Sequence, residues 1–194
     1  MRRIAGVVGG IAVVAALLVG CGSAPPPSGA ELWRAEISNA IPEATSDWER
    51  EILERSAEQG FISDEDFAYA EQMYLQCMAD RGVPLTKTID PVTGGRTYAT
   101  EAMEPGPLND AVPEIQRECS IANGIGVRSL YASMRKNPDF RDPDELMAEC
   151  LAREGLVDAG YSGEDFDRDM TSGSSPYDLD SVEFRRCIEN PSGA

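Results

Sequence analysis

"YLQCMADRGV", residues Tyr74–Val83, is echoed 73 residues later by "MAECLAREGL", residues Met147–Leu156. In both, a cysteine stands five residues before a glycine and is followed by an apolar residue and an alanine. Apolar residues recur upstream at helical spacing, so each cysteine is expected on the inward face of a helix. Gly82 and Gly155 fit the left-handed position that ends a helix. The echo predicts a mainly α protein with two similar helical halves.

Each half carries a second cysteine on a later, charged helix, in "IQREC" up to Cys119 and in "EFRRC" up to Cys187. The interval between the two cysteines is 42 residues in the half of Cys77 and 37 residues in the half of Cys150. Both halves therefore have the order helix-Cys-Gly, connector, helix-Cys. A chance resemblance between two helix ends is the alternative explanation of the echo.

The first twenty residues have the layout of an export signal, with two arginines before an uncharged stretch from Ile4 to Val19. A membrane-spanning helix is the alternative, since a span needs ~18–20 apolar residues. The next feature, "LVGC" from Leu18 to Cys21, resembles the lipobox of bacterial lipoproteins. That resemblance implies cleavage before Cys21 and a diacylglyceryl group on its sulfur. We therefore expect a lipid anchor on the outer face of the cell membrane.

The chain divides into four expected segments. Residues 1–20 are the signal peptide, and residues 21–30, with "GSAPPPSG", form a flexible tether rich in Pro, Gly and Ser. Residues 31–136 form an N-terminal helical region with the first repeat and a β-hairpin. Residues 137–194 hold the second repeat.

Several local signals refine this division. Leu85–Ile89 and Arg96–Thr100 are β-rich runs around turn residues, which predicts the hairpin. Ser46 and Glu49 have the spacing of a helix capping box. The stretch 158–178, "DAGYSGEDFDRDMTSGSSPYD", is polar and acidic, and we expect a loop with at most one helical turn.

An even set of cysteines in an exported domain indicates disulfides. If the repeat holds, each half is closed on itself by Cys77–Cys119 and Cys150–Cys187. The alternatives pair Cys77 with Cys150 or with Cys187 and cross the halves. No two of these cysteines are close enough in sequence for a C-x-x-C zinc or redox motif.

Charge and composition exclude several classes of activity. The net charge of −17 becomes −19 once Arg2 and Arg3 leave with the signal peptide, so we expect no nucleic-acid partner. The chain has no histidine, which excludes Ser-His-Asp and Cys-His catalysis. The sequence indicates no cofactor.

The many acids suggest two further sites. Paired carboxylates could hydrolyse wall glycans, and Glu154, Glu164 and Asp165 are the candidates for such an enzyme. The D-x-D-x-D run within residues 164–169 opens like a calcium loop, although Met170 stands where that loop needs glycine. A solvated acidic surface is the simpler interpretation of both, and we expect no catalytic or metal-binding residues.

The motifs "GFISDED", "YLQCMADRG" and "MAECLAREG" resemble those of a diffuse group of secreted actinobacterial lipoproteins. The resemblance covers roughly Trp48 to Cys187 and implies location and disulfide architecture only. We expect a non-catalytic binding or accessory module of the cell envelope, whose partner is another envelope protein or a wall component.

Overall fold

A computed structural model describes residues 26–100 and 104–193. Cys21, the signal peptide and most of the tether lie outside these described residues. The elements are α1 (Gly29–Ala40), η1 (Ile41–Glu43), α2 (Asp47–Gln59), α3 (Asp64–Asp80), β1 (Leu85–Ile89), β2 (Arg96–Thr100), α4 (Pro107–Ala122), α5 (Ile125–Lys136), α6 (Pro143–Arg153), α7 (Gly163–Ser172) and α8 (Val182–Glu189). The predicted fold class, mainly α with one small antiparallel hairpin, is confirmed.

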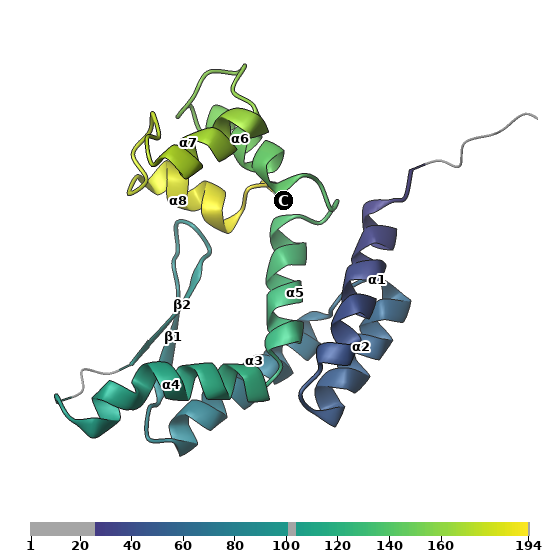
Figure 1. Cartoon of the computed structure of the whole chain (residues 1–194), viewed down its shortest axis with the longest axis vertical. Helices are drawn as coiled ribbons and strands as arrows, with labels where there is room; N and C mark the ends of the chain where they lie inside the picture. Colours follow the sequence, from purple (N-terminus) through teal and green to yellow (C-terminus); the bar gives the residue numbers. More distant parts are fainter. Residues whose placement is uncertain (1–25, 101–103, 194) are drawn as a thin grey trace, which may run out of the picture.

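Helix α5 connects the two halves of the molecule (Figure 1). The helices α1 to α4 belong to the larger half, in which α1 runs beside α5, and the helices α6, α7 and α8 form the smaller half beyond the far end of α5 (Figure 1). The hairpin rises from the larger half, and its tip lies next to α8 (Figure 1). Its strands occupy the predicted ranges and pair antiparallel, from Leu85 with Thr100 to Ile89 with Arg96.

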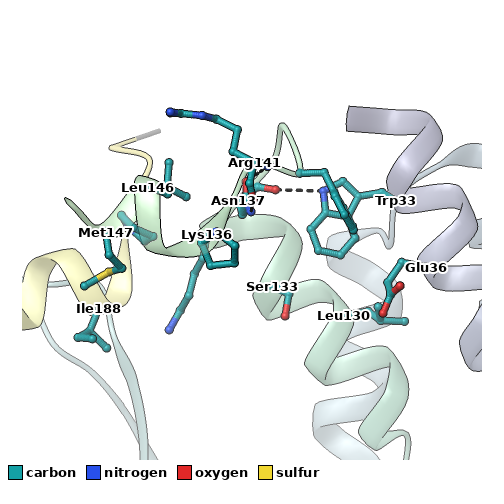
Figure 2. Close-up of a pocket in the computed structure, with 13 residues that line it drawn as sticks. Trp33, Glu36, Leu130, Ser133, Lys136, Asn137, Arg141, Leu146, Met147 and Ile188 are labelled. Atoms are coloured by element: carbon teal, nitrogen blue, oxygen red, sulfur yellow. Dashed lines mark hydrogen bonds between the residues drawn. The ribbon is translucent and has the colours of Figure 1, made fainter. Parts of the chain in front are cut away.

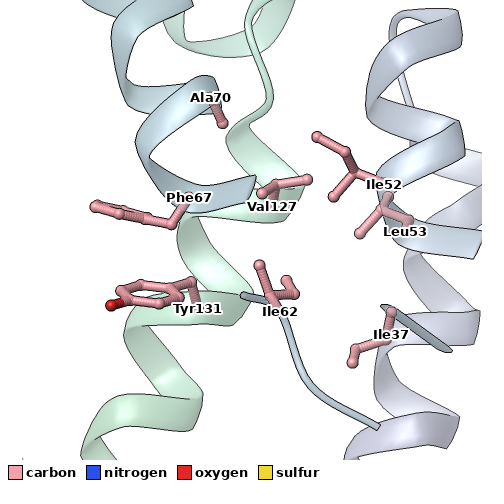
Figure 3. Packing of buried hydrophobic residues seen from close by; sticks show 8 residues of the cluster. All are labelled: Ile37, Ile52, Leu53, Ile62, Phe67, Ala70, Val127 and Tyr131. Atoms are coloured by element: carbon pink, nitrogen blue, oxygen red, sulfur yellow. The ribbon is translucent and has the colours of Figure 1, made fainter. Parts of the chain in front are cut away.

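Three groups of buried side chains hold these elements together. The first lies between α1, α2, α3 and α5 and includes Ile37, Leu53 and Val127, which are fully buried (Figure 3). The second lies in the smaller half around Leu151 and Phe184. The third joins α3 to α4 and consists of Tyr74, Met78, Val83, Ile115 and Cys119. The apolar faces of the helices therefore form separate cores in the two halves.

The two disulfides lie within the halves, as the repeat predicts. Cys77 bonds to Cys119 and thereby links α3 to α4. Cys150 bonds to Cys187 and links α6 to α8. In the chain-entropy description, closing loops of this length stabilises the folded chain by ~4 kcal/mol each. The alternative pairings of Cys77 with Cys150 or with Cys187 are therefore not formed.

The echo also has the same local structure in both halves. Gly82 and Gly155 adopt φ of 80° and 75° and end α3 and α6. The amide that follows each glycine donates five residues back, from Val83 to Met78 and from Leu156 to Leu151, at 2.9 Å in both cases. This is the Schellman arrangement, in which a left-handed residue satisfies the last carbonyls of a helix.

The expected loop at 158–178 is wrong, because α7 occupies Gly163–Ser172. Ser162 and Asp165 form a capping box that supplies partners for the first amides of this helix. Phe166 and Tyr161 then pack against the core of the smaller half. Capping and one apolar face outweigh the low helix propensity of the Asp, Ser and Gly residues here.

Candidate functional site

An apolar cavity of about 500 Å³ lies where the two halves meet (Figure 2). Its apolar lining comes from α1, α5, the connector after α5, α6 and α8, and includes Trp33, Leu130, Phe140, Leu146, Met147 and Ile188. Because neither half alone contributes the whole lining, the cavity exists only when the halves are docked as they are here. Its volume falls within the ~300–1,000 Å³ of small-molecule sites.

Trp33 fixes one wall of the cavity. It lies on α1, it is 6% exposed, and its indole N–H donates to the carbonyl of Asn137 at 3.0 Å (Figure 2). The ring of Phe140 meets the Trp33 ring edge-on, with centroids 4.7 Å apart. Phe140 adopts φ of 53°, a left-handed conformation that is rare for an aromatic residue. The connector is therefore held against α1 by one hydrogen bond and one aromatic pair.

The start of α1 also packs closely on this connector. A β-carbon added at Gly29 would lie 2.6 Å from the backbone of Asp139. Only glycine permits an approach this close, and Gly29 is the first residue of α1. Ser28 and Glu31 cap its first turn.

Most polar side chains around the cavity are paired with other parts of the protein. The side-chain amide of Asn137 donates to the carbonyl of Arg141 at 2.7 Å and accepts from the Arg141 amide at 2.8 Å. The guanidinium of Arg141 pairs with Glu149, and the ammonium of Lys136 lies 3.7 Å from the carboxylate of Glu189. The surface offered to a ligand is consequently mainly hydrocarbon.

A second cavity of about 730 Å³ adjoins the hairpin tip and also touches Trp33. Its lining is more polar, with Asp64, Thr93 and Arg135 beside Tyr131 and Met134. The hydroxyl of Tyr131 donates to Asp64 at 2.7 Å, which uses part of this polar surface internally.

The hairpin that borders the second cavity is fixed by a buried carboxylate. Glu71 on α3 is 6% exposed and accepts hydrogen bonds from Lys87 at 2.6 Å and from the hydroxyl of Tyr98. Burial raises the pKa of Glu71, but these two hydrogen bonds together with the positive charges of Lys87 and Arg96 outweigh burial and leave the pKa below its ordinary value. Arg96 lies over the ring of Phe67, 4.8 Å from its centroid. Both strands are thus attached to α3.

Another buried carboxylate supports α5. Glu49 is 1% exposed, and one of its oxygens accepts from the amide of Gly126 at 3.0 Å. Its other oxygen accepts from the amide and the hydroxyl of Thr45, each at 3.0 Å. The predicted capping box with Ser46 is therefore only half formed: Ser46 accepts from the Glu49 amide, while the carboxylate supports the start of α5 instead.

The acids suggested as catalytic pairs have other roles in the described structure. Glu154 pairs with Arg186, and Asp165 caps α7 and pairs with Arg168 at 2.7 Å. Glu164 is exposed on the first turn of α7. None of the three lines either cavity described above.

The D-x-D-x-D run belongs to α7, where Asp165, Asp167 and Asp169 cannot converge as they do in a calcium loop. Among residues 26–100 and 104–193, no three Cys, Asp or Glu side chains are grouped as metal ligands would be.

Among the residues that line the first cavity, Trp33 is distinctive in the sequence because it is one of two tryptophans. Leu146 and Met147 follow ordinary helical spacing, and Phe140 lies in a connector. No local pattern distinguishes them from core residues, because the cavity arises from how the halves dock.

Within the described residues, no helix has the length and hydropathy required for a transmembrane span. The chain matches no protein-family model, no curated protein and no solved structure.

Proposed function

We propose that this protein is a lipoprotein anchored to the outer face of the cell membrane through Cys21, where it acts as a non-catalytic binding module of the envelope. The observation that carries the binding role is the apolar cavity between the two halves. The lipobox-like "LVGC" carries the anchoring role. The two disulfides support the location, since structural disulfides persist in oxidising compartments outside the cytosol.

The cavity supports binding rather than catalysis because it lacks convergent reactive groups. Its carboxylate is Glu36, and its other charged groups, Lys136 and Arg141, face ion-pair partners. The chain has no histidine to act as a general base. The partners in this proposal are the membrane, through the lipid on Cys21, and another envelope protein or a wall component.

Photo-crosslinking in cells tests the binding role. A photoreactive residue at Ser133, which is exposed and lines the cavity, should give a reproducible crosslinked product. The same residue at Ser129, one turn earlier on α5 and outside both cavities, is the matched control. Turnover of wall glycan fragments by the purified protein would overturn the proposal in favour of a carboxylate enzyme.

A further inference from the structure

We infer that the cavity between the halves receives the acyl chain of a membrane lipid. The inference rests on the proposed function, because the anchor on Cys21 is what keeps the cavity at the membrane surface. It specifies the chemistry of the ligand, which the proposed function leaves general.

The lining of the cavity has the chemistry that an acyl chain requires. Trp33, Leu146 and Met147 are at most 9% exposed and form an apolar base, and Ile188 is 41% exposed at the edge. A polar ligand would need donors or acceptors aimed at it, since unpaired polar groups are costly to bury. The Trp33 indole N–H and the Asn137 side-chain amide already bond within the protein. A hydrocarbon chain needs no hydrogen-bonding partner in the lining.

The cavity also lies close to the anchored cysteine along the chain. Cys21 lies eight residues before Gly29, where α1 begins. An extended chain spans at most ~3.6 Å per residue, so α1 starts no more than ~29 Å from the anchored sulfur. Trp33 is four residues further, or ~6 Å along the helix. The tether is therefore short enough to hold the cavity close to the bilayer surface, where acyl chains are concentrated.

The free energy of moving a lipid tail into the cavity also permits this ligand. Burying a CH₂ group from water is favourable by a similar amount whether the group enters a bilayer or an apolar cavity. A lipid tail that moves from the membrane into this cavity exchanges one apolar surrounding for another. The net free energy of this transfer is then small. We therefore expect lipid binding to be reversible and to depend on how well the tail fills the cavity.

The experiment uses the mature, acylated protein reconstituted in phosphatidylcholine vesicles that contain a phosphatidylcholine with a photoactivatable acyl chain. After irradiation, we expect the label on peptides that contain Met147 or Ile188. Ser133→Trp, which places a large ring in the cavity from an exposed helical site, should reduce this labelling about tenfold. The matched control Ser129→Trp should be labelled as the wild type is.

A second pair of variants tests polarity instead of space. Ile188→Asp introduces a charge at the edge of the cavity and should also reduce labelling about tenfold. Leu179→Asp, at a residue 44% exposed and outside the cavity, is its control. Thermal unfolding of each variant establishes that it is folded before labelling is compared.

The outcomes separate the two proposals. Acylated protein that floats with the vesicles but is labelled only near its N-terminus would overturn the lipid-binding inference and leave the anchor intact. Equal labelling of Ser133→Trp and Ser129→Trp would overturn it as well. Acylated protein that fails to float would instead contradict the proposed anchoring.

Discussion

The indole of Trp33 on α1 donates a hydrogen bond to the backbone carbonyl of Asn137, 104 residues later in the chain. Asn137 directly follows α5 and begins the connector to α6. The bond therefore joins the first helix of the larger half to the segment that positions the smaller half. Trp33 also lines both cavities, so one side chain links the docking of the halves to the shape of the candidate site.

Trp33→Phe should lower the free energy of unfolding by about 1–2 kcal/mol, because it removes this hydrogen bond and some buried surface. It should also accelerate amide hydrogen exchange in residues 137–142, which measures local opening of the connector. Trp48→Phe, which alters the half-buried ring paired with Tyr69, should leave exchange in 137–142 unchanged. Equal exchange in the two variants would contradict the role assigned to Trp33.

Glu49→Ala should destabilise the protein by about 2 kcal/mol, because it removes a fully buried carboxylate and the acceptor of the half-buried Gly126 amide and of the Thr45 amide. Urea unfolding measures the change. Glu51→Ala, at an exposed position two residues along α2, should change stability by no more than ~0.5 kcal/mol. A Glu49→Ala variant as stable as Glu51→Ala would show that the carboxylate does not support α5.

Gly124→Ala should cost more than Gly173→Ala, although both glycines adopt left-handed φ, of 69° and 67°. The left-handed conformation costs an alanine about 1–2 kcal/mol at either site. At Gly124 the added β-carbon would also meet the ring of Trp48 at 2.5 Å, whereas nothing lies within 4 Å at Gly173. The difference between the losses of unfolding free energy in Gly124→Ala and Gly173→Ala measures how tightly Trp48 packs on Gly124. Equal losses in the two variants would contradict this packing.

Helix α7 should depend on pH through Asp165. Hydrogen bonds from the backbone and side chain of Ser162, and then from Arg168, lower the pKa of Asp165 from 3.8 to about 2. A lowered pKa contributes stability that is complete above the unfolded pKa and is lost as pH falls from about 4 to about 2.

The melting temperature of Asp165→Asn should accordingly lie below that of the wild type at pH 6 and converge with it near pH 2. Asp167→Asn, on the same helix but outside the cap, is the control and should show a smaller difference at pH 6. A wild-type advantage over Asp165→Asn that persisted unchanged at pH 2 would contradict the assigned cap.

Features that depend on neighbouring residues could be predicted from the sequence. The hairpin has the predicted strand limits, because turn residues and β-rich runs specify it locally. Gly82 and Gly155 end their helices as expected. The pairing of Cys77 with Cys119, which the assumption of a repeat predicts, is the pairing found.

Features that depend on distant residues could not be predicted in this way. Phe140 lies 73 positions after Phe67, as Cys150 lies after Cys77, yet Phe67 belongs to α3 and Phe140 to a strained connector. Glu49 and Glu71 resemble surface acids in the sequence, and their burial follows from partners far along the chain. The cavity has the same origin, since it requires both halves.

Anchoring through Cys21 can be tested by mass spectrometry of the N-terminal peptide. The protein for this measurement is isolated from the membranes of cells that make it. We predict a peptide that begins at Cys21 and carries a diacylglyceryl group, and that disappears together with membrane attachment in Cys21→Ser. Ala24→Ser, three residues further along the tether, should retain the modification. A chain with an unmodified Cys21, or one that retains Met1 and still fractionates with the membrane, would contradict the account.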